Sequence, residues 1–127
     1  MYKYSINILL CTLLLISCSK KKNLFIRLPQ SLPDTVSIYF DNLNSNKLKV
    51  DKEGNYYLNV EHNLIETSSA YKDISSLNFK YSFLGKNWQS ESQFKSKYGI
   101  EIIESTGGTT DSNGHFVPKF IQLIFIK

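Results

Sequence analysis

Alternating apolar and polar residues over much of the chain predict β-strands. The stretch LNFKYSFL at 77–84 places leucine, phenylalanine and tyrosine side chains on one face, as a half-buried strand does. Other short runs are rich in β-branched and aromatic residues, and they predict strands at 24–28, 35–40, 100–104 and 119–126. The last run, KFIQLIFI, is apolar on both faces, so we expect it in the centre of a sheet.

A β-hairpin is the clearest local prediction. Residues 47–51 and 56–61 both alternate, and the sequence KEGN between them supplies a glycine where a tight turn needs a positive φ. In this register one face of the hairpin is expected to point toward the core, through Leu48, Val50, Tyr56, Leu58 and Val60.

One short helix is predicted at 90–98. Ser90 can cap its first turn and Gln93 completes a capping box, while Gly99 stands where a helix commonly ends. Residues 66–76 fit either a loop or one or two helical turns, and the pattern does not decide between them.

A polar segment with three glycines, STGGTTDSNGHFVP at 105–118, separates the last two predicted strands. We expect a long loop there, joining an antiparallel pair, with glycines that serve a flexible turn. The predicted fold class is therefore mainly β, an antiparallel sheet or small sandwich with one short helix, preceded by an N-terminal signal helix.

The length of 127 residues suits a single domain, which we assign to residues 24–127. The formal charge of +4 comes from Lys3 and the run Lys20–Lys22. Removing these four leaves eleven of the fifteen Lys and Arg residues, against eleven Asp and Glu, so the domain is neutral. A nucleic-acid-binding face needs clustered basic residues, and we expect no nucleic-acid partner.

Both cysteines, Cys11 and Cys18, lie ahead of this domain. The domain therefore has no disulfide and must be stable through packing. Residues 1–17 carry an early lysine and then an apolar run at 6–16, the pattern of a secretory signal peptide. That run is shorter than the roughly 20 apolar residues that a membrane-spanning helix needs.

The end of this run, Leu15, Ile16, Ser17 and Cys18, resembles the lipobox of bacterial lipoprotein signal peptides. The resemblance implies cleavage between Ser17 and Cys18, a thioether bond from Cys18 to diacylglycerol, and acylation of the new N-terminus. Residues 18–23 would form a lipidated tether, and the membrane would be a partner through this lipid.

Two features of the tether bear on location. The lysine run either contacts anionic headgroups or forms a solvated tether, and both interpretations stay open. Ser19 is not the aspartate that resembles an inner-membrane retention signal, which favours an outer-membrane lipoprotein facing the periplasm.

Catalytic chemistry finds little support in the sequence. The domain has no thiol, and its two histidines, His62 and His115, lack metal-binding spacing. The glycine-rich segment lacks the arrangement of a phosphate-binding loop, and Thr109, Asp111 and His115 are ordinary loop residues rather than a hydrolytic set. We expect no enzyme activity, no cofactor and no metal.

Partner binding is the better use of the long loop and of the single tryptophan. The candidate contact residues are Trp88, Thr109, Asp111, Asn113 and His115. The first hypothesis is a lipid-anchored periplasmic binding module of the inhibitor or immunity type, with a protein partner. The alternative is a structural or accessory lipoprotein of an envelope assembly. A concave surface containing residues 106–115 would favour the first hypothesis, and a long free strand edge or flat apolar patch the second.

Overall fold

The computed structural model describes residues 21–127. The expected signal helix, Ser17 and Cys18 lie outside these residues. The described elements are, in chain order, β1 Asn23–Arg27, β2 Thr35–Tyr39, β3 Lys49–Val50, β4 Tyr56–Asn59, β5 Leu64–Glu66, α2 Tyr71–Ser75, β6 Asn78–Ser82, α3 Glu91–Tyr98, β7 Glu101–Thr110 and β8 Phe116–Ile126.

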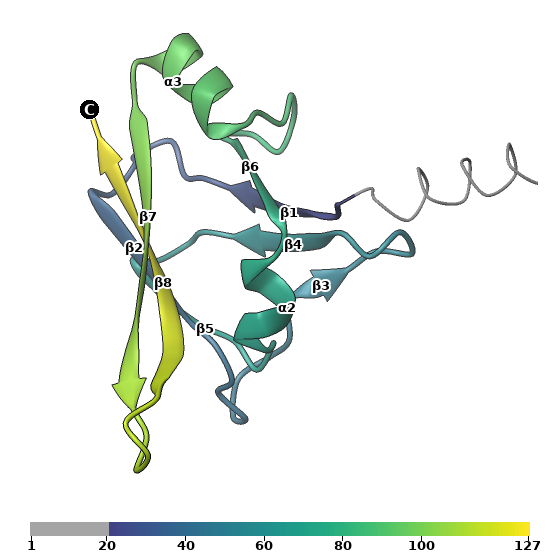
Figure 1. The fold of residues 1–127 in the computed structure, drawn as a ribbon. Coiled ribbons are helices and arrows are strands. Elements are labelled where there is room, and N and C mark those ends of the chain that lie inside the picture. The colour runs from purple at the N-terminus through teal and green to yellow at the C-terminus, as the bar shows by residue number, and fades with distance from the viewer. Residues whose placement is uncertain (1–20) are drawn as a thin grey trace, which may run out of the picture.

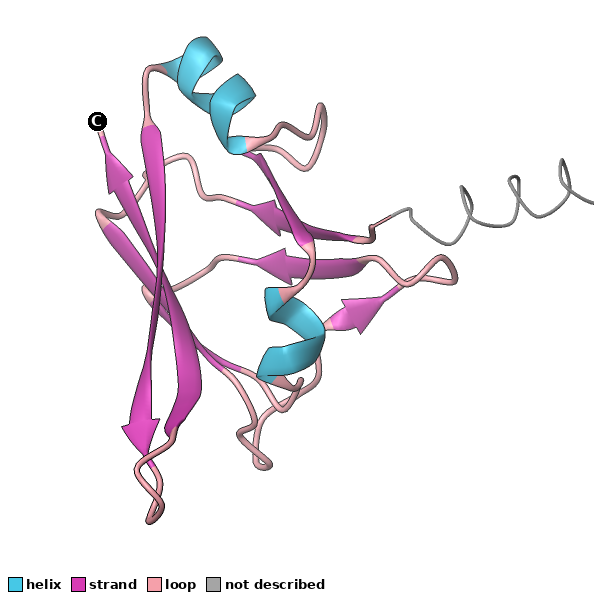
Figure 2. Cartoon of the chain, viewed as in Figure 1, coloured by secondary structure: helices cyan, strands magenta, loops and turns pink. Residues whose placement is uncertain are grey.

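Two four-stranded sheets make up the domain (Figures 1 and 2). Sheet A has the strand order β3-β4-β1-β6, and sheet B has the order β5-β2-β8-β7. The apolar core combines side chains of both sheets with Ile74 of α2 and Phe94 of α3. The mainly β class is thereby confirmed.

Strand pairing is more mixed than the predicted antiparallel arrangement. Strand β1 is parallel to both of its neighbours, β4 and β6, and β2 is parallel to β5. The cause is the path of the chain, which alternates between the sheets. It runs from β1 in sheet A to β2 in sheet B, returns to sheet A for β3 and β4, and then places β5 in sheet B and β6 in sheet A. The parallel neighbours are therefore not joined by hairpins, whereas the consecutive pairs β3–β4 and β7–β8 are antiparallel.

The predicted hairpin is present as the antiparallel pair β3–β4, with Gly54 in its turn at φ +85°. Leu58 and Val60 are buried as expected, but the prediction for Val50 was wrong, since 55% of this residue is exposed. Strand β3 is only two residues long and lies at the edge of sheet A, where little covers its side chains.

Helix α3 is confirmed together with its predicted ends. The Ser90 hydroxyl accepts the Gln93 backbone N–H, the Gln93 side chain accepts the Ser90 N–H, and Gly99 follows in the left-handed conformation. Helix α2 lies within the undecided segment 66–76, so the domain has two described helices rather than the single one expected. No helix among residues 21–127 is long and apolar enough to cross a bilayer.

The long loop predicted at 105–118 was wrong, because strand pairing continues to Thr110 and Phe116 and leaves only a short turn. Gly107 and Gly108 lie at a β-bulge within β7. A Cβ on Gly107 would lie 2.0 Å from the Phe120 ring, and one on Gly108 only 2.1 Å from the backbone oxygen of Val117. These glycines therefore permit close contact inside a strand. Strand β8 is central in sheet B, as predicted.

Candidate binding site

An aromatic row crosses the outer face of sheet A. Lys49 pairs with Tyr57, Tyr57 with Phe25, and Phe25 with Lys80, so four side chains from β3, β4, β1 and β6 share one cross-strand line. Residues two apart along a strand point to the same side, and Leu24 and Ile26 are fully buried. Phe25 is therefore held on the outside by the burial of its neighbours. We call these four residues, two aromatic side chains with a lysine at each end, the aromatic row.

Trp88 extends the row from a loop. Its ring lies 4.9 Å from that of Phe25, and Tyr57 lies 5.2 Å from Phe25 on the other side, with the rings tilted by 46° and 33° respectively. Phe25 and Trp88 are half-buried, and Tyr57 is 40% exposed. Such tilted contacts stabilise aromatic clusters while leaving ring surface free for a ligand.

Hydrogen bonds fix the loop that carries Trp88. The Ser82 hydroxyl donates to the Lys86 carbonyl at 2.6 Å and accepts the Lys86 backbone N–H at 3.0 Å. On the other side of Trp88, Gln89 and Tyr81 exchange two backbone hydrogen bonds of 2.8 and 3.0 Å. The indole is thus attached to two fixed points and is a stable part of the face.

Asp51 orients the Tyr57 ring. Its carboxylate accepts the Tyr57 hydroxyl at 2.9 Å, as well as the backbone N–H groups of Glu53 and Asn55. Burial would raise the pKa of the Asp51 carboxyl, but these hydrogen bonds hold that pKa below its ordinary value. The same hydrogen bond raises the pKa of the Tyr57 hydroxyl, which therefore stays protonated as a donor.

Positive charge surrounds the aromatic row. Arg27 follows Phe25 by two residues on β1, and Lys49 and Lys80 are the two end members of the row. Within the described chain, none of these three cations has an ion-pair partner. No carboxylate stands at the outward strand positions of sheet A, which are Asn23, Phe25, Arg27, Lys49, Tyr57, Asn59, Asn78, Lys80 and Ser82.

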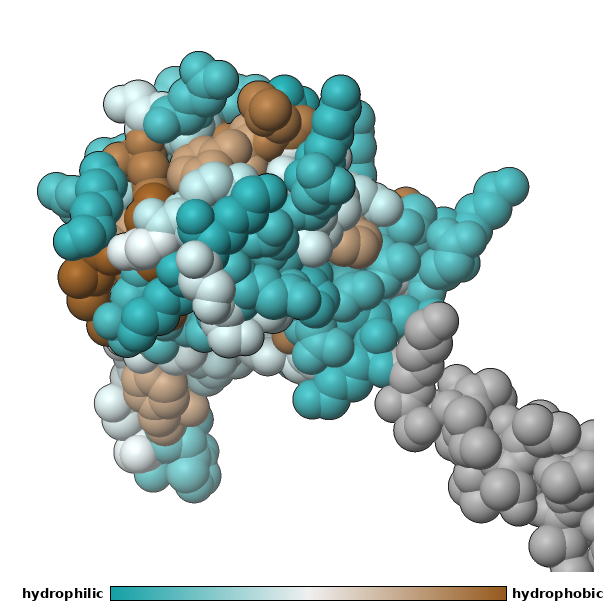
Figure 3. Space-filling model, turned by 90° about the horizontal axis from the view of Figure 1, so that it is seen from above, coloured by the Kyte–Doolittle hydropathy of each residue, from teal (hydrophilic) through white to brown (hydrophobic). Residues whose placement is uncertain are grey.

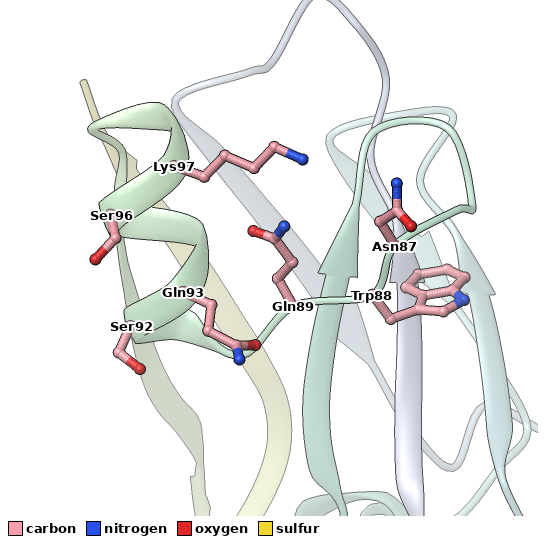
Figure 4. A pocket seen from close by; sticks show the side chains of 7 residues that line it. All are labelled: Asn87, Trp88, Gln89, Ser92, Gln93, Ser96 and Lys97. Atoms are coloured by element: carbon pink, nitrogen blue, oxygen red, sulfur yellow. The ribbon is translucent and has the colours of Figure 1, made fainter.

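Two hollows meet at Trp88. The first has a volume of about 820 Å³ and takes in most of the aromatic row together with Arg27 and Asn59; Glu61 and Glu66 also line it. The second, of about 660 Å³, lies between this loop and α3 (Figure 4). In Figure 4, Lys97 and Gln89 extend into the second hollow, whose buried Gln89 Oε1 has no hydrogen-bond partner among the described residues.

The other predicted contact residues lie elsewhere. Thr109 lies in the last part of β7, and Asp111, Asn113 and His115 lie in the turn at the tip of the β7–β8 hairpin, which projects at the lower end of Figure 1. The Asp111 carboxylate accepts the backbone N–H groups of Asn113 and His115, both at 2.9 Å. All four are exposed, and none lines either hollow. A concave surface containing residues 106–115 would have favoured the binding-module hypothesis, but neither hollow includes these residues.

Five members of the site were missed from sequence: Phe25, Tyr57, Arg27, Lys49 and Lys80. Each belongs to a predicted strand, and the alternation already placed Phe25 opposite the buried Leu24 and Ile26. An aromatic residue at an outward position was the available signal. Its importance depended on the pairing of β1 with β4, which the local pattern does not contain.

A second polar cluster lies where α3 meets β7. The buried Tyr81 hydroxyl donates to Glu104 Oε1 at 2.9 Å. A hydrogen bond with Glu104, together with burial and the charge of Glu104, raises the pKa of Glu91 to about 7. Burial and Glu104 also raise the pKa of Tyr81. Across residues 21–127, no three His, Cys, Asp or Glu side chains gather as a metal site.

Comparison with known proteins gives one similar fold. No protein-family model matches the chain, and no curated protein matches it. The crystal structure of a "Putative Lipoprotein from Bacillus anthracis" is similar with a TM-score of 0.54 and 15% identity, over 82% of this chain and 68% of that chain. At this identity the similarity shows the fold alone. The fold and the face together describe a small two-sheet β domain with an aromatic, basic surface.

Proposed function

We propose that this chain is a lipid-anchored protein of the bacterial envelope whose domain acts as a binding module without enzyme activity. The outer face of sheet A carries the proposal, since three aromatic rings lie there beside three cations that have no ion-pair partner within residues 21–127. Tryptophan, tyrosine and arginine are the residues that most often dominate binding energy. The contact surface we propose therefore centres on Trp88, with Tyr57 and Phe25.

The anchor would be Cys18, supported by the lipobox sequence and by the lipoprotein name of the similar structure. Strand β1 begins only five residues after Cys18, a span of at most about 18 Å for a fully extended chain. Sheet A would thus be held close to the membrane surface. We propose the outer membrane, with the domain in the periplasm, because Ser19 follows the cysteine.

The anchor is tested by Cys18→Ser. We expect this variant to lose incorporation of labelled fatty acid and to accumulate as a precursor about 2 kDa larger than the processed chain. Cys11→Ser is the matched control and should leave both properties unchanged. Fatty-acid labelling that persists in Cys18→Ser would contradict the lipid anchor.

The binding face is tested by site-specific cross-linking in the envelope. A photoreactive residue at Tyr57 should capture a molecule, whereas the same residue at Ser112, in the exposed hairpin turn, should not. Cross-links from position 112 alone would contradict a binding site on sheet A and would indicate a site at the hairpin tip.

The accessory role remains a second candidate because of the outer face of sheet B. The strand positions of that face contain no lysine or arginine and combine apolar residues with the polar Ser37, Gln122 and Ser105. The Tyr39 and Phe120 rings lie 4.9 Å apart on it. In Figure 3, hydrophobic residues gather on the side where Figure 1 has sheet B. Such a surface suits a protein partner. The edge strand β7 is a weaker candidate for pairing with a partner strand, because its bulge and the inward Glu104 oppose such pairing.

A photoreactive residue at Ile103, which is exposed on this face, tests the second candidate. Cross-links to a protein from position 103, with none from position 57, would favour the accessory role over the binding module.

A further inference from the structure

We infer that the outer face of sheet A binds an acidic oligosaccharide, laid along the aromatic row from Lys49 to Lys80. This inference rests on the proposed binding module and specifies its ligand. Three kinds of side chain share this face: aromatic rings, amides and cations. Each matches one chemical feature of a sugar that carries carboxylate groups.

The aromatic rings match the apolar faces of sugar rings. Tyr57, Phe25 and Trp88 follow one another with centroid separations of 5.2 and 4.9 Å, so they form a continuous surface across three elements. A pyranose ring has C–H groups on its faces, and it can lie flat on such a surface. Asp51 holds the Tyr57 ring in place before any ligand arrives.

Amide groups flank the rings and match the hydroxyl groups of a sugar. Asn23 and Asn78 face outward on one side of the row and are the amides assigned to the ligand. Asn59 faces outward on the other side, where its amide donates to Glu61 at 3.5 Å. An amide both donates and accepts hydrogen bonds, as a hydroxyl does. These positions are unlike the core of a protein interface, which is apolar and poor in charge.

The cations match carboxylates. Arg27, Lys49 and Lys80 have no ion-pair partner among the described residues, and the outward strand positions contain no acidic residue. The acidic residues nearby are Asp51 and Glu53 in the β3–β4 turn beside Tyr57, and the pair Glu61 and Glu66 in the wall of the hollow. We therefore place the ligand along the row and away from that pair.

The hollow beside the row is large enough for a small ligand. The hollow of about 820 Å³ is within the range of small-ligand sites, roughly 300–1,000 Å³. Single-stranded nucleic acid shares the combination of stacking and charge, so the experiment must separate it from an acidic sugar.

The single tryptophan of the chain provides the measurement. We propose to titrate the full chain, in detergent, with tetragalacturonate and to follow Trp88 fluorescence. We expect a saturable change, with an affinity at least about tenfold higher than for the neutral maltotetraose. The affinity should fall as salt rises, because ionic screening weakens contacts to exposed cations.

Two variants and a matched control locate the site. Tyr57→Ala and Lys49→Ala should each weaken tetragalacturonate binding by about tenfold, which corresponds to about 1.4 kcal/mol. Tyr39→Ala removes a similarly exposed tyrosine, 37% against 40%, from the outer face of sheet B and should bind as the parent chain does. Circular dichroism of each variant would show that the fold is kept.

Several outcomes would overturn the inference. Two of them concern the ligand: equal affinity for maltotetraose, or tighter binding of a decathymidylate. A third is an undiminished affinity for tetragalacturonate in Tyr57→Ala. The fourth is the absence of a fluorescence change with tetragalacturonate, together with the absence of binding heat in calorimetry. Failure here is distinct from failure of the proposed function. Cross-linking from position 57 to a protein would retain the binding module and reject the sugar, whereas loss of all cross-links would reject the module itself.

Discussion

The outer faces of the two sheets differ in chemistry although both belong to four-stranded sheets over one core. Sheet A presents aromatic rings among cations and amides, while sheet B presents Tyr39, Phe120 and isoleucines with little charge. The inner faces of both sheets are alike, since both are apolar. The comparison shows that the core accounts for the fold, and that the outward positions, which stability constrains least, carry the information about binding.

Gly108→Ala should have the largest effect, and it should act on sheet B. The added Cβ would overlap the Val117 backbone oxygen, which cannot move without breaking the β7–β8 ladder. We expect a loss of about 2–4 kcal/mol in the free energy of unfolding, measured by denaturant titration. Ser105→Ala, at an exposed position of the same strand, should change it by less than about 0.5 kcal/mol. A neutral result for Gly108→Ala would mean that the bulge adapts.

Trp88→Ala should act on sheet A and be smaller. The half-buried indole loses its contact with Phe25, but its loop stays attached through Ser82 and Gln89. We expect a loss of about 1–2 kcal/mol in thermal or chemical unfolding. A loss as large as that of Gly108→Ala would show that Trp88 belongs to the core rather than to a binding face.

Asp51→Ala should destabilise the β3–β4 turn less than Trp88→Ala destabilises sheet A, because the hydrogen bonds that the turn loses lie at an exposed site. It should also free the Tyr57 ring, which nuclear magnetic resonance would detect as faster ring motion. Glu53→Ala, its exposed neighbour in the turn, is the control and should leave the ring signals unchanged. Unchanged Tyr57 signals in Asp51→Ala would mean that packing alone orients the ring.

Glu91→Gln should have the smallest effect, and one that depends on pH. The folded-state pKa of about 7 lies above the ordinary value of 4.5, so the native protein favours the protonated carboxyl. Its stabilising contribution is complete below about pH 4.5 and is lost as the pH rises through about 7.

As the pH rises from 5 to 8, we therefore expect the free energy of unfolding of Glu91→Gln to increase relative to that of the parent chain. The increase should be at most about 1 kcal/mol, because solvent screens this exposed residue. Unfolding curves at both pH values measure the gain, with pH 5 as the internal reference. A difference that is the same at both pH values would contradict the interaction with Glu104.

Much of the fold could be predicted where the signal is local. The ends of α3 depend on contacts within one turn, and Ser90, Gln93 and Gly99 stand next to the groups that they satisfy. Strand faces follow from alternation, as Leu24 and Ile26 show. The prediction failed at Gly107 and Gly108, where glycine indicates either a turn or a close approach, and only the position of Phe120 and Val117 distinguishes the two.

The candidate site was harder to predict than the fold. Trp88 was singled out for its residue type and does lie in the site, whereas the polar turn containing Asp111 and His115 was chosen for loop composition. In the structure, the Asp111 carboxylate binds the backbone of its own turn. Composition cannot separate a side chain that stabilises a turn from one that is free to bind a partner.

The sequence by itself determined which side of β4 is buried, where α3 begins and ends, that β8 is central, and that residues 23–127 carry no net charge. Only the tertiary structure decided that β1 lies between β4 and β6, which brings Phe25, Tyr57 and Lys80 into one row. The physical reason is that alternation has a period of two along one strand and specifies a face. The choice of neighbouring strand depends on packing between distant segments, which no local pattern records.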